Sequence, residues 1–128
     1  MKDILIELHT LKEMTDTLIL PAAYSYFGAL ASSAAEGKAA GITELPQLDR
    51  ANEIGALAKE LKANRDALAA VIEEAESMHA DVADCAALLT GAGAQRIADV
   101  RRVSDALEIL VADDHWPLPK YREMLFPV

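Results

Sequence analysis

The sequence predicts an all-α protein: an antiparallel bundle of three long helices with a docked, non-helical C-terminal tail. Hydrophobic residues make up 52% of the 128 residues, and the best helix former, alanine, supplies many of them. Aromatic residues, which favour sheets, make up only 5%. Apolar residues recur at three- and four-residue steps along three long stretches. A chain of this length suits one core, so residues 1–128 are predicted to form a single helical domain with a tail at 113–128.

The first helix is predicted to run from Lys2 to Lys38, because apolar side chains keep to one face of it. That face comprises Ile4, Leu8, Leu11, Leu18, Ala22, Tyr26 and Leu30. Pro21 lies inside the helix and lacks a backbone N–H, so we expect a kink there. Two glycines and a proline in residues 36–47 predict the first connection.

The second helix is predicted to run from Gln47 to Met78 and has the clearest periodicity. Its apolar positions alternate steps of three and four, which is typical of a heptad seam. The seam is Ile54, Leu57, Leu61, Asn64, Leu68, Val71, Ala75 and Met78. Asn64 is its polar member, and two interpretations stay open: an Asn that reaches water at the edge of the seam, or a buried Asn that fixes helix register.

The third helix is predicted to follow a tight connection at 79–82, with Asp81 as its N-cap, and to end near Ala112. Its apolar stripe is Val82, Ala86, Leu89, Gly93, Ile97, Val100, Ser104, Leu107 and Val111. Gly91 and Gly93 interrupt the helical pattern, so a break into two shorter helices stays open. The stripe stays in phase across them, and one continuous helix is expected. The lone cysteine, Cys85, is expected to be a small buried apolar side chain.

The C-terminal segment 116–126, WPLPKYREMLF, is unusually apolar for a chain end. Two prolines prevent it from continuing the third helix. Its large side chains would anchor it on a surface, because burying one Leu or Phe contributes about 1.5–3 kcal/mol. The candidate docking residues are Trp116, Leu118, Tyr121, Leu125 and Phe126.

The charge balance excludes some classes of partner. The formal net charge is −9, and both nucleic acids and anionic membranes select clusters of Lys and Arg. We therefore expect no nucleic-acid and no membrane partner. The single cysteine and the lack of a signal-peptide pattern favour the cytoplasm.

No catalytic, cofactor-binding or metal-binding residue is predicted. Glu76 and His79 have the Glu-x-x-His spacing of ferritin-like di-iron sites, but those sites need the motif twice. The Gly-x-Gly in residues 90–96 has Arg96 where a dinucleotide fingerprint needs glycine, and no strand precedes it. His9 and Glu13 are expected to form an ordinary surface pair.

Both ends of the chain carry a family resemblance. Residues 101–126 combine an acidic-aliphatic helix with Trp-Pro-x-Pro-x-Tyr and a Leu-Phe pair, and residues 6–26 lead through Leu-Pro-Ala to a Tyr. The chain thereby resembles the C-terminal end of type III glutamine synthetases. The matching positions are Glu7, Met14, Leu20, Pro21, Ala22, Tyr26, Arg101, Asp105, Leu107, Glu108, Trp116, Pro117, Pro119, Tyr121, Leu125 and Phe126.

The resemblance implies a parent enzyme that ligates glutamate and ammonia with ATP and a divalent metal such as Mg, in large oligomers. It also implies that catalysis belongs to an upstream domain, so this chain would be a non-catalytic C-terminal module. Its expected partners are that upstream catalytic domain and neighbouring subunits. The alternatives are a free-standing three-helix adaptor and a metal-dependent bundle enzyme.

Overall fold

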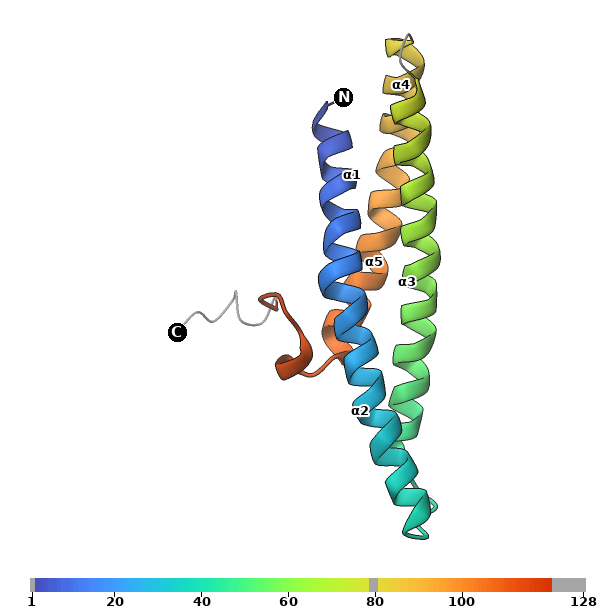
Figure 1. The fold of residues 1–128 in the computed structure, drawn as a ribbon, viewed down its shortest axis with the longest axis vertical. Helices are drawn as coiled ribbons and strands as arrows, with labels where there is room; N and C mark the ends of the chain where they lie inside the picture. The colour runs from blue at the N-terminus through green and yellow to red at the C-terminus, as the bar shows by residue number, and fades with distance from the viewer. Residues whose placement is uncertain (1, 79–80, 121–128) are drawn as a thin grey trace.

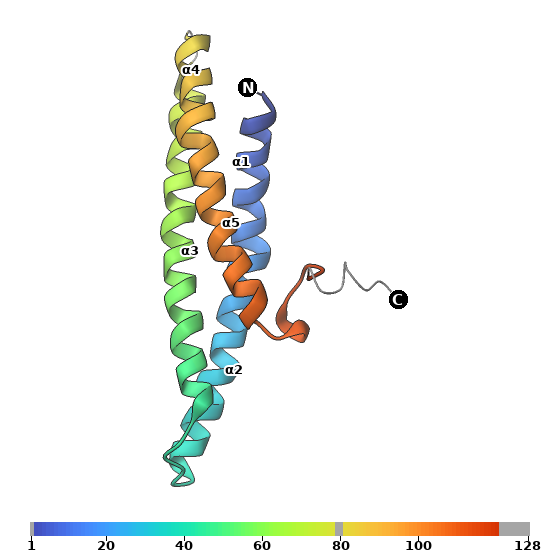
Figure 2. The same cartoon turned by 180° about the vertical axis from the view of Figure 1, so that it is seen from behind.

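The computed structural model describes residues 2–78 and 81–120. These residues form three long helical segments and one short 3₁₀ turn, and no strand occurs among them (Figure 1). The chain passes along the length of the molecule three times, with the segments side by side (Figures 1 and 2). The predicted all-α class and the three long helices are therefore confirmed.

The first helical segment changes its winding just before its proline. It consists of α1 (Lys2–Met14), a π-helical turn η1 (Thr15–Ile19) and α2 (Leu20–Ala39). In η1 the Leu20 N–H bonds the Thr15 carbonyl, five residues back. In a regular α-helix the Pro21 ring would clash with the Thr17 carbonyl, four residues back. Thr17 lies within the π-helical turn, where the helix is wider. The helix also changes direction between α1 and α2 (Figure 1), as expected of a proline kink.

The first connection is a glycine-terminated helix end. Gly41 has φ 85°, a left-handed conformation that glycine adopts without steric cost. The Gly41 N–H bonds the Lys38 carbonyl and the Ile42 N–H bonds the Gly37 carbonyl, which is the Schellman pattern. Helix α3 (Pro46–Ser77) then begins with proline at its first position, where a missing N–H costs nothing.

The predicted seam of α3 lies on the core. Ile54, Leu61 and Leu68 are fully buried. Asn64 is half-buried, and its amide donates to the Asp99 carbonyl of the third helical segment at 3.3 Å. The side chain therefore lies at the edge of the seam, as the first interpretation had it, but it bonds another helix and not only water.

The third helical segment is continuous across its glycines but wound differently there. It consists of α4 (Val82–Leu88), a π-helical turn η2 (Leu89–Gly93) and α5 (Ala94–Leu110). The Asp81 carboxylate accepts a hydrogen bond from the Asp84 N–H at 3.0 Å, so the predicted N-cap is confirmed. Cys85 is buried, also as predicted.

Two expectations for this segment are wrong. Val82 was assigned to the apolar stripe but is 66% exposed. Helix α4 extends past the N-terminal end of α1, so the first segment does not cover it (Figure 1). The helix also ends at Leu110 rather than Ala112, because Val111 is extended. Arg50 donates to the freed Leu110 carbonyl at 3.4 Å.

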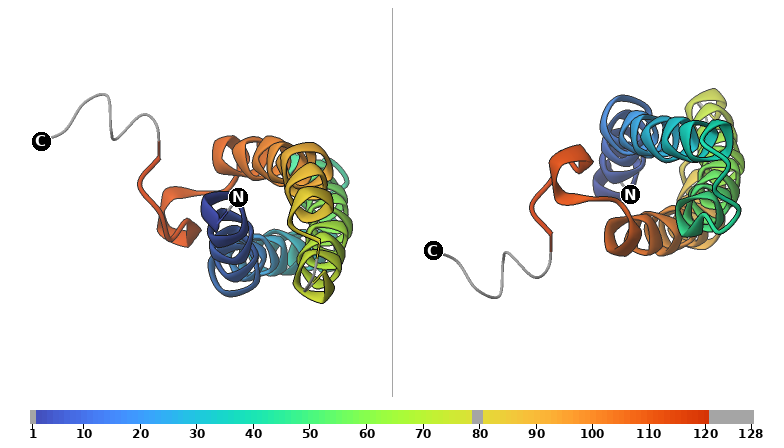
Figure 3. Two further views of the ribbon diagram at one scale, coloured as in Figure 1. Left: turned by 90° about the horizontal axis from the view of Figure 1, so that it is seen from above. Right: turned by 90° about the horizontal axis from the view of Figure 1, so that it is seen from below.

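The core runs along the space between the three segments (Figure 3). Every segment supplies fully buried side chains to it, namely Leu8, Ile54, Leu61, Leu68, Leu89, Val100, Val103 and Leu107. Trp116, from the segment after α5, belongs to the same cluster.

Candidate functional site

The segment that follows α5 turns back onto the helices through an extended residue and a 3₁₀ turn, η3 (Asp113–His115). Val111 at its start is 1% exposed and Trp116 after the turn is 9% exposed. The two residues bracket η3 and both belong to the core cluster. The turn thus places Trp116 in the core cluster, and the backbone of this segment lies beside the helices (Figure 2).

His115 ties this segment to α2. Its Nδ1 is hydrogen-bonded to Ser25 Oγ at 3.1 Å. Its ring lies 5.3 Å from the ring of Tyr26, centroid to centroid, in a tilted arrangement. Ser25 and Tyr26 are adjacent on α2, so one imidazole meets a polar and an aromatic group of the same turn.

Lys120, at the end of this segment, contacts Val111 and Asp113 at its start. Its ammonium group lies 2.9 Å from Asp113 Oδ1 and donates to the Val111 carbonyl, which the end of α5 leaves without a helical partner. The Lys120 side chain is only 12% exposed. Leu118, between the two prolines, packs against the core cluster. Residues 111–120 therefore form a small closed loop against the helices.

The structure places part of the predicted docking set. Trp116 is buried, as its size led us to expect, and Leu118 is half-buried. Tyr121, Leu125 and Phe126 lie outside the described residues. Sequence reasoning gave no role to His115. Its partner Ser25 lies 90 residues away, and no spacing rule indicates such a contact.

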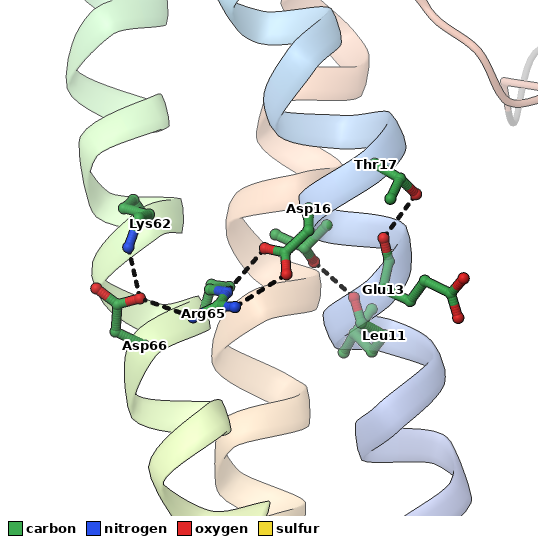
Figure 4. A network of polar contacts seen from close by, with 8 residues as sticks. Leu11, Glu13, Asp16, Thr17, Lys62, Arg65 and Asp66 are labelled. Carbon is green, nitrogen blue, oxygen red and sulfur yellow. Dashed lines mark hydrogen bonds and ion pairs between the residues drawn. The ribbon is translucent and has the colours of Figure 1, made fainter.

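A second polar constellation lies at η1. Asp16 accepts two hydrogen bonds from Arg65 on α3, from Nε at 2.7 Å and from Nη2 at 2.9 Å (Figure 4). Arg65 also reaches Asp66, which is paired with Lys62 at 2.6 Å. The hydrogen bonds from Arg65 hold the pKa of Asp16 below its ordinary value of 3.8. These residues fasten the first and second helical segments together.

The remaining candidates for chemistry do not assemble into a site. Among the residues that the structure describes, no three His, Cys, Asp or Glu side chains are placed to hold a metal ion. His79 of the Glu-x-x-His motif lies outside those residues. His9 pairs with Glu76 on α3 at 3.2 Å, so the expected surface pair with Glu13 is replaced by a contact between helices.

By length and composition alone, the described helix Asp3–Ala39 is apolar enough to cross a membrane. A core helix of a soluble protein passes the same test, and this helix contributes Leu8, Ile19 and Ala23 to the buried cluster. The buried share of its most apolar window is nevertheless only 28%, which leaves apolar side chains on its outer face.

The fold and the segment after α5 define the class: a helical domain of three long segments with an aromatic anchor packed on its side. The chain is similar to the type-3 glutamine synthetase of Dictyostelium discoideum, with 28% identity over 131 residues. The alignment covers 98% of this chain but only 18% of that enzyme, at its C-terminal part. The resemblance inferred from the two ends of the sequence is thereby confirmed. No family model and no solved structure matches the chain.

Proposed function

We propose that this chain is the non-catalytic C-terminal helical domain of a glutamine synthetase. One observation carries the proposal: the similarity to the type-3 enzyme runs through nearly the whole chain, yet it spans less than a fifth of the enzyme. A parent enzyme of this kind would ligate glutamate and ammonia with ATP and a divalent metal such as Mg. Those cofactors would bind in the upstream catalytic domain rather than in this one.

The proposed architecture is an antiparallel three-helix bundle that carries a docked tail. The helix bounds support it: α2 ends at Ala39 and α3 begins at Pro46, and α3 ends at Ser77 and α4 begins at Val82, so few residues separate consecutive segments that lie side by side. The burial of Trp116 and the Ser25–His115 hydrogen bond support the docked tail. The proposed role is structural: contacts with the catalytic domain and neighbouring cytoplasmic subunits, or regulation through them.

The alternative is a free-standing three-helix adaptor protein. The continuous buried core supports it, since that core needs no second domain. The reading frame upstream of Met1 separates the two. An uninterrupted frame encoding a catalytic domain supports the enzyme module, and an independent start at Met1 supports the adaptor.

The functional test compares the full-length enzyme with a version that lacks residues 1–128. We expect the deletion to change assembly or activity, measured by light scattering and glutamine formation. The isolated chain should form no glutamine from glutamate, ammonia and ATP. Glutamine formation by the isolated chain, or a deleted enzyme unchanged in both assembly and activity, would contradict the proposal.

A further inference from the structure

An apolar hollow of about 330 Å³ lies between α2 and α3. Tyr24 and Phe27 form one wall and are 53% and 40% exposed, which is high for aromatic side chains. Gly55 on α3 faces Phe27 and leaves room for its ring, because a Cβ on Gly55 would lie 3.2 Å from that ring. The hollow is therefore open to solvent, and no described side chain of this chain fills it.

Two lysines of α3, Lys59 and Lys62, line the same hollow. Lys62 is paired with Asp66, whereas Lys59 has no ion pair among the described residues. The chain as a whole has 21 acidic and 12 basic side chains, so Lys59 is a positive group beside the hollow in a mostly acidic protein. The hollow suits an apolar side chain with a carboxylate close by.

Helix α5 presents such a group. Ile109 is 81% exposed, more than any other large apolar side chain among the described residues. Asp105 lies one helical turn before it, on the same face, and is exposed without an ion pair in the described part of the chain. The hollow of α2 and α3 is thus open to an apolar side chain beside a carboxylate, and α5 exposes Ile109 beside Asp105.

We infer that two copies of this chain associate by inserting Ile109 of one copy between Tyr24 and Phe27 of the other, with Asp105 facing Lys59. The hollow is lined only by α2 and α3 and Ile109 lies on α5, so the contact joins two different surfaces. Such a contact is heterologous and leaves each copy able to bind a further one. The contact area is small, so the association is weak in the isolated chain. This inference goes beyond the proposed function, because it holds for a free-standing protein as well as for an enzyme module.

The test is sedimentation of the full 128-residue chain over a wide concentration range. The average mass should rise with concentration, and Ile109→Asp or Lys59→Glu should each weaken association by about tenfold or more. Lys38→Glu in the last turn of α2 and Ile42→Asp in the α2–α3 connection are changes of the same kind; they serve as controls and should leave association unchanged.

A mixing experiment tests the heterologous geometry. The Ile109→Asp chain retains its hollow and the Lys59→Glu chain retains its Ile109, so a mixture should form dimers that do not extend. Lys59→Asp combined with Asp105→Lys should restore association. Ile109→Ser and Tyr24→Ser repeat the test if a charged variant fails to fold. A monomer at every concentration, association unaffected by these variants, or no dimer on mixing would each overturn the inference.

Discussion

Asp16 and Arg65 form the best-defined polar contact between the helical segments, because both carboxylate oxygens face one guanidinium group (Figure 4). Both side chains are partly exposed, at 35% and 23%, so solvent weakens the pair. We expect Asp16→Asn to lower the free energy of unfolding at pH 7 by up to about 1 kcal/mol, measured by urea denaturation.

The effect should depend on pH in a defined direction. The folded-state pKa of Asp16 lies below its ordinary 3.8, so the pair stabilises the protein above that pH. The contribution is lost as the pH falls through the lower, folded-state value. Wild type and Asp16→Asn should therefore converge in strong acid. Glu13→Gln, whose carboxylate points away from the network (Figure 4), is the control; an equal loss in that variant would assign the effect to general charge.

Leu68 tests the seam of α3. It is fully buried in the core, so Leu68→Ala should lower the free energy of unfolding by about 2–5 kcal/mol through lost burial and a residual cavity. Val82→Ala removes similar atoms from a side chain that is 66% exposed and should cost less than about 0.5 kcal/mol. Urea titrations of the two variants make the comparison. Equal losses would show that the seam is not the core.

Residue periodicity predicted most of the core positions and failed where packing ends. The positions of Ile54, Leu61 and Leu68 were correct because a period of three and four places them on one face. The predicted burial of Val82 was wrong, because its exposure depends on how far the neighbouring helix extends. The periodicity of its own helix does not indicate that length. Asn64 bonds a backbone carbonyl of α5, a partner that periodicity does not specify.

At the scale of elements, proline and glycine marked the helix boundaries but not the winding of the turns. Pro46 begins α3 and Gly41 follows the end of α2, close to the predicted connection. The π-helical turns η1 and η2 were not predicted. In η1 the hydroxyl of Thr15 donates to the Leu11 carbonyl at 2.7 Å. This side-chain hydrogen bond competes with the backbone hydrogen bonds of a helix, and the apolar periodicity of the sequence does not indicate it.

Two glycines should respond oppositely to alanine. A Cβ on Gly91, in η2, would meet no atom within 4 Å, so Gly91→Ala should stabilise the protein by about 0.5–1 kcal/mol. Gly41 has φ 85°, so Gly41→Ala should destabilise it by about 1–2 kcal/mol. Thermal unfolding under identical conditions measures both. A loss of stability in Gly91→Ala would show that η2 needs its glycine.

The segment after α5 should depend on its aromatic anchor. Trp116 is 9% exposed and belongs to the core cluster, so Trp116→Ala should lower the free energy of unfolding by about 3–5 kcal/mol. The wild-type indole should emit at short wavelength and be quenched poorly by acrylamide. Pro117→Ala, at the exposed neighbouring position, should change stability little. Emission like that of free tryptophan would show that the segment is not held against the helices.

For the whole molecule, sequence patterns predicted the three helices and a buried tryptophan, but not how the segment is fixed. Trp116 was identified because a large aromatic side chain near a chain end needs a surface. The contacts of His115 with Ser25 and Tyr26 arise only when α2 and η3 come together. The hollow between α2 and α3 was equally unpredictable, since it depends on Phe27 lying over Gly55 on a different helix.

The continuous core predicts that the chain unfolds as one unit. The buried cluster includes Leu8 near the start, Leu68 in α3 and Trp116 after α5, so no part of the described chain has a core of its own. Urea unfolding followed by Trp116 fluorescence should therefore coincide with unfolding followed by helical circular dichroism, as two-state behaviour requires. The two probes are independent because the sole tryptophan reports the segment after α5 and dichroism reports the helices. Loss of the fluorescence signal at lower urea than the helical signal would make residues 111–120 a separate, weaker unit. Truncation after Asp114 would then leave the helical transition unchanged, whereas a single cooperative domain should lose stability.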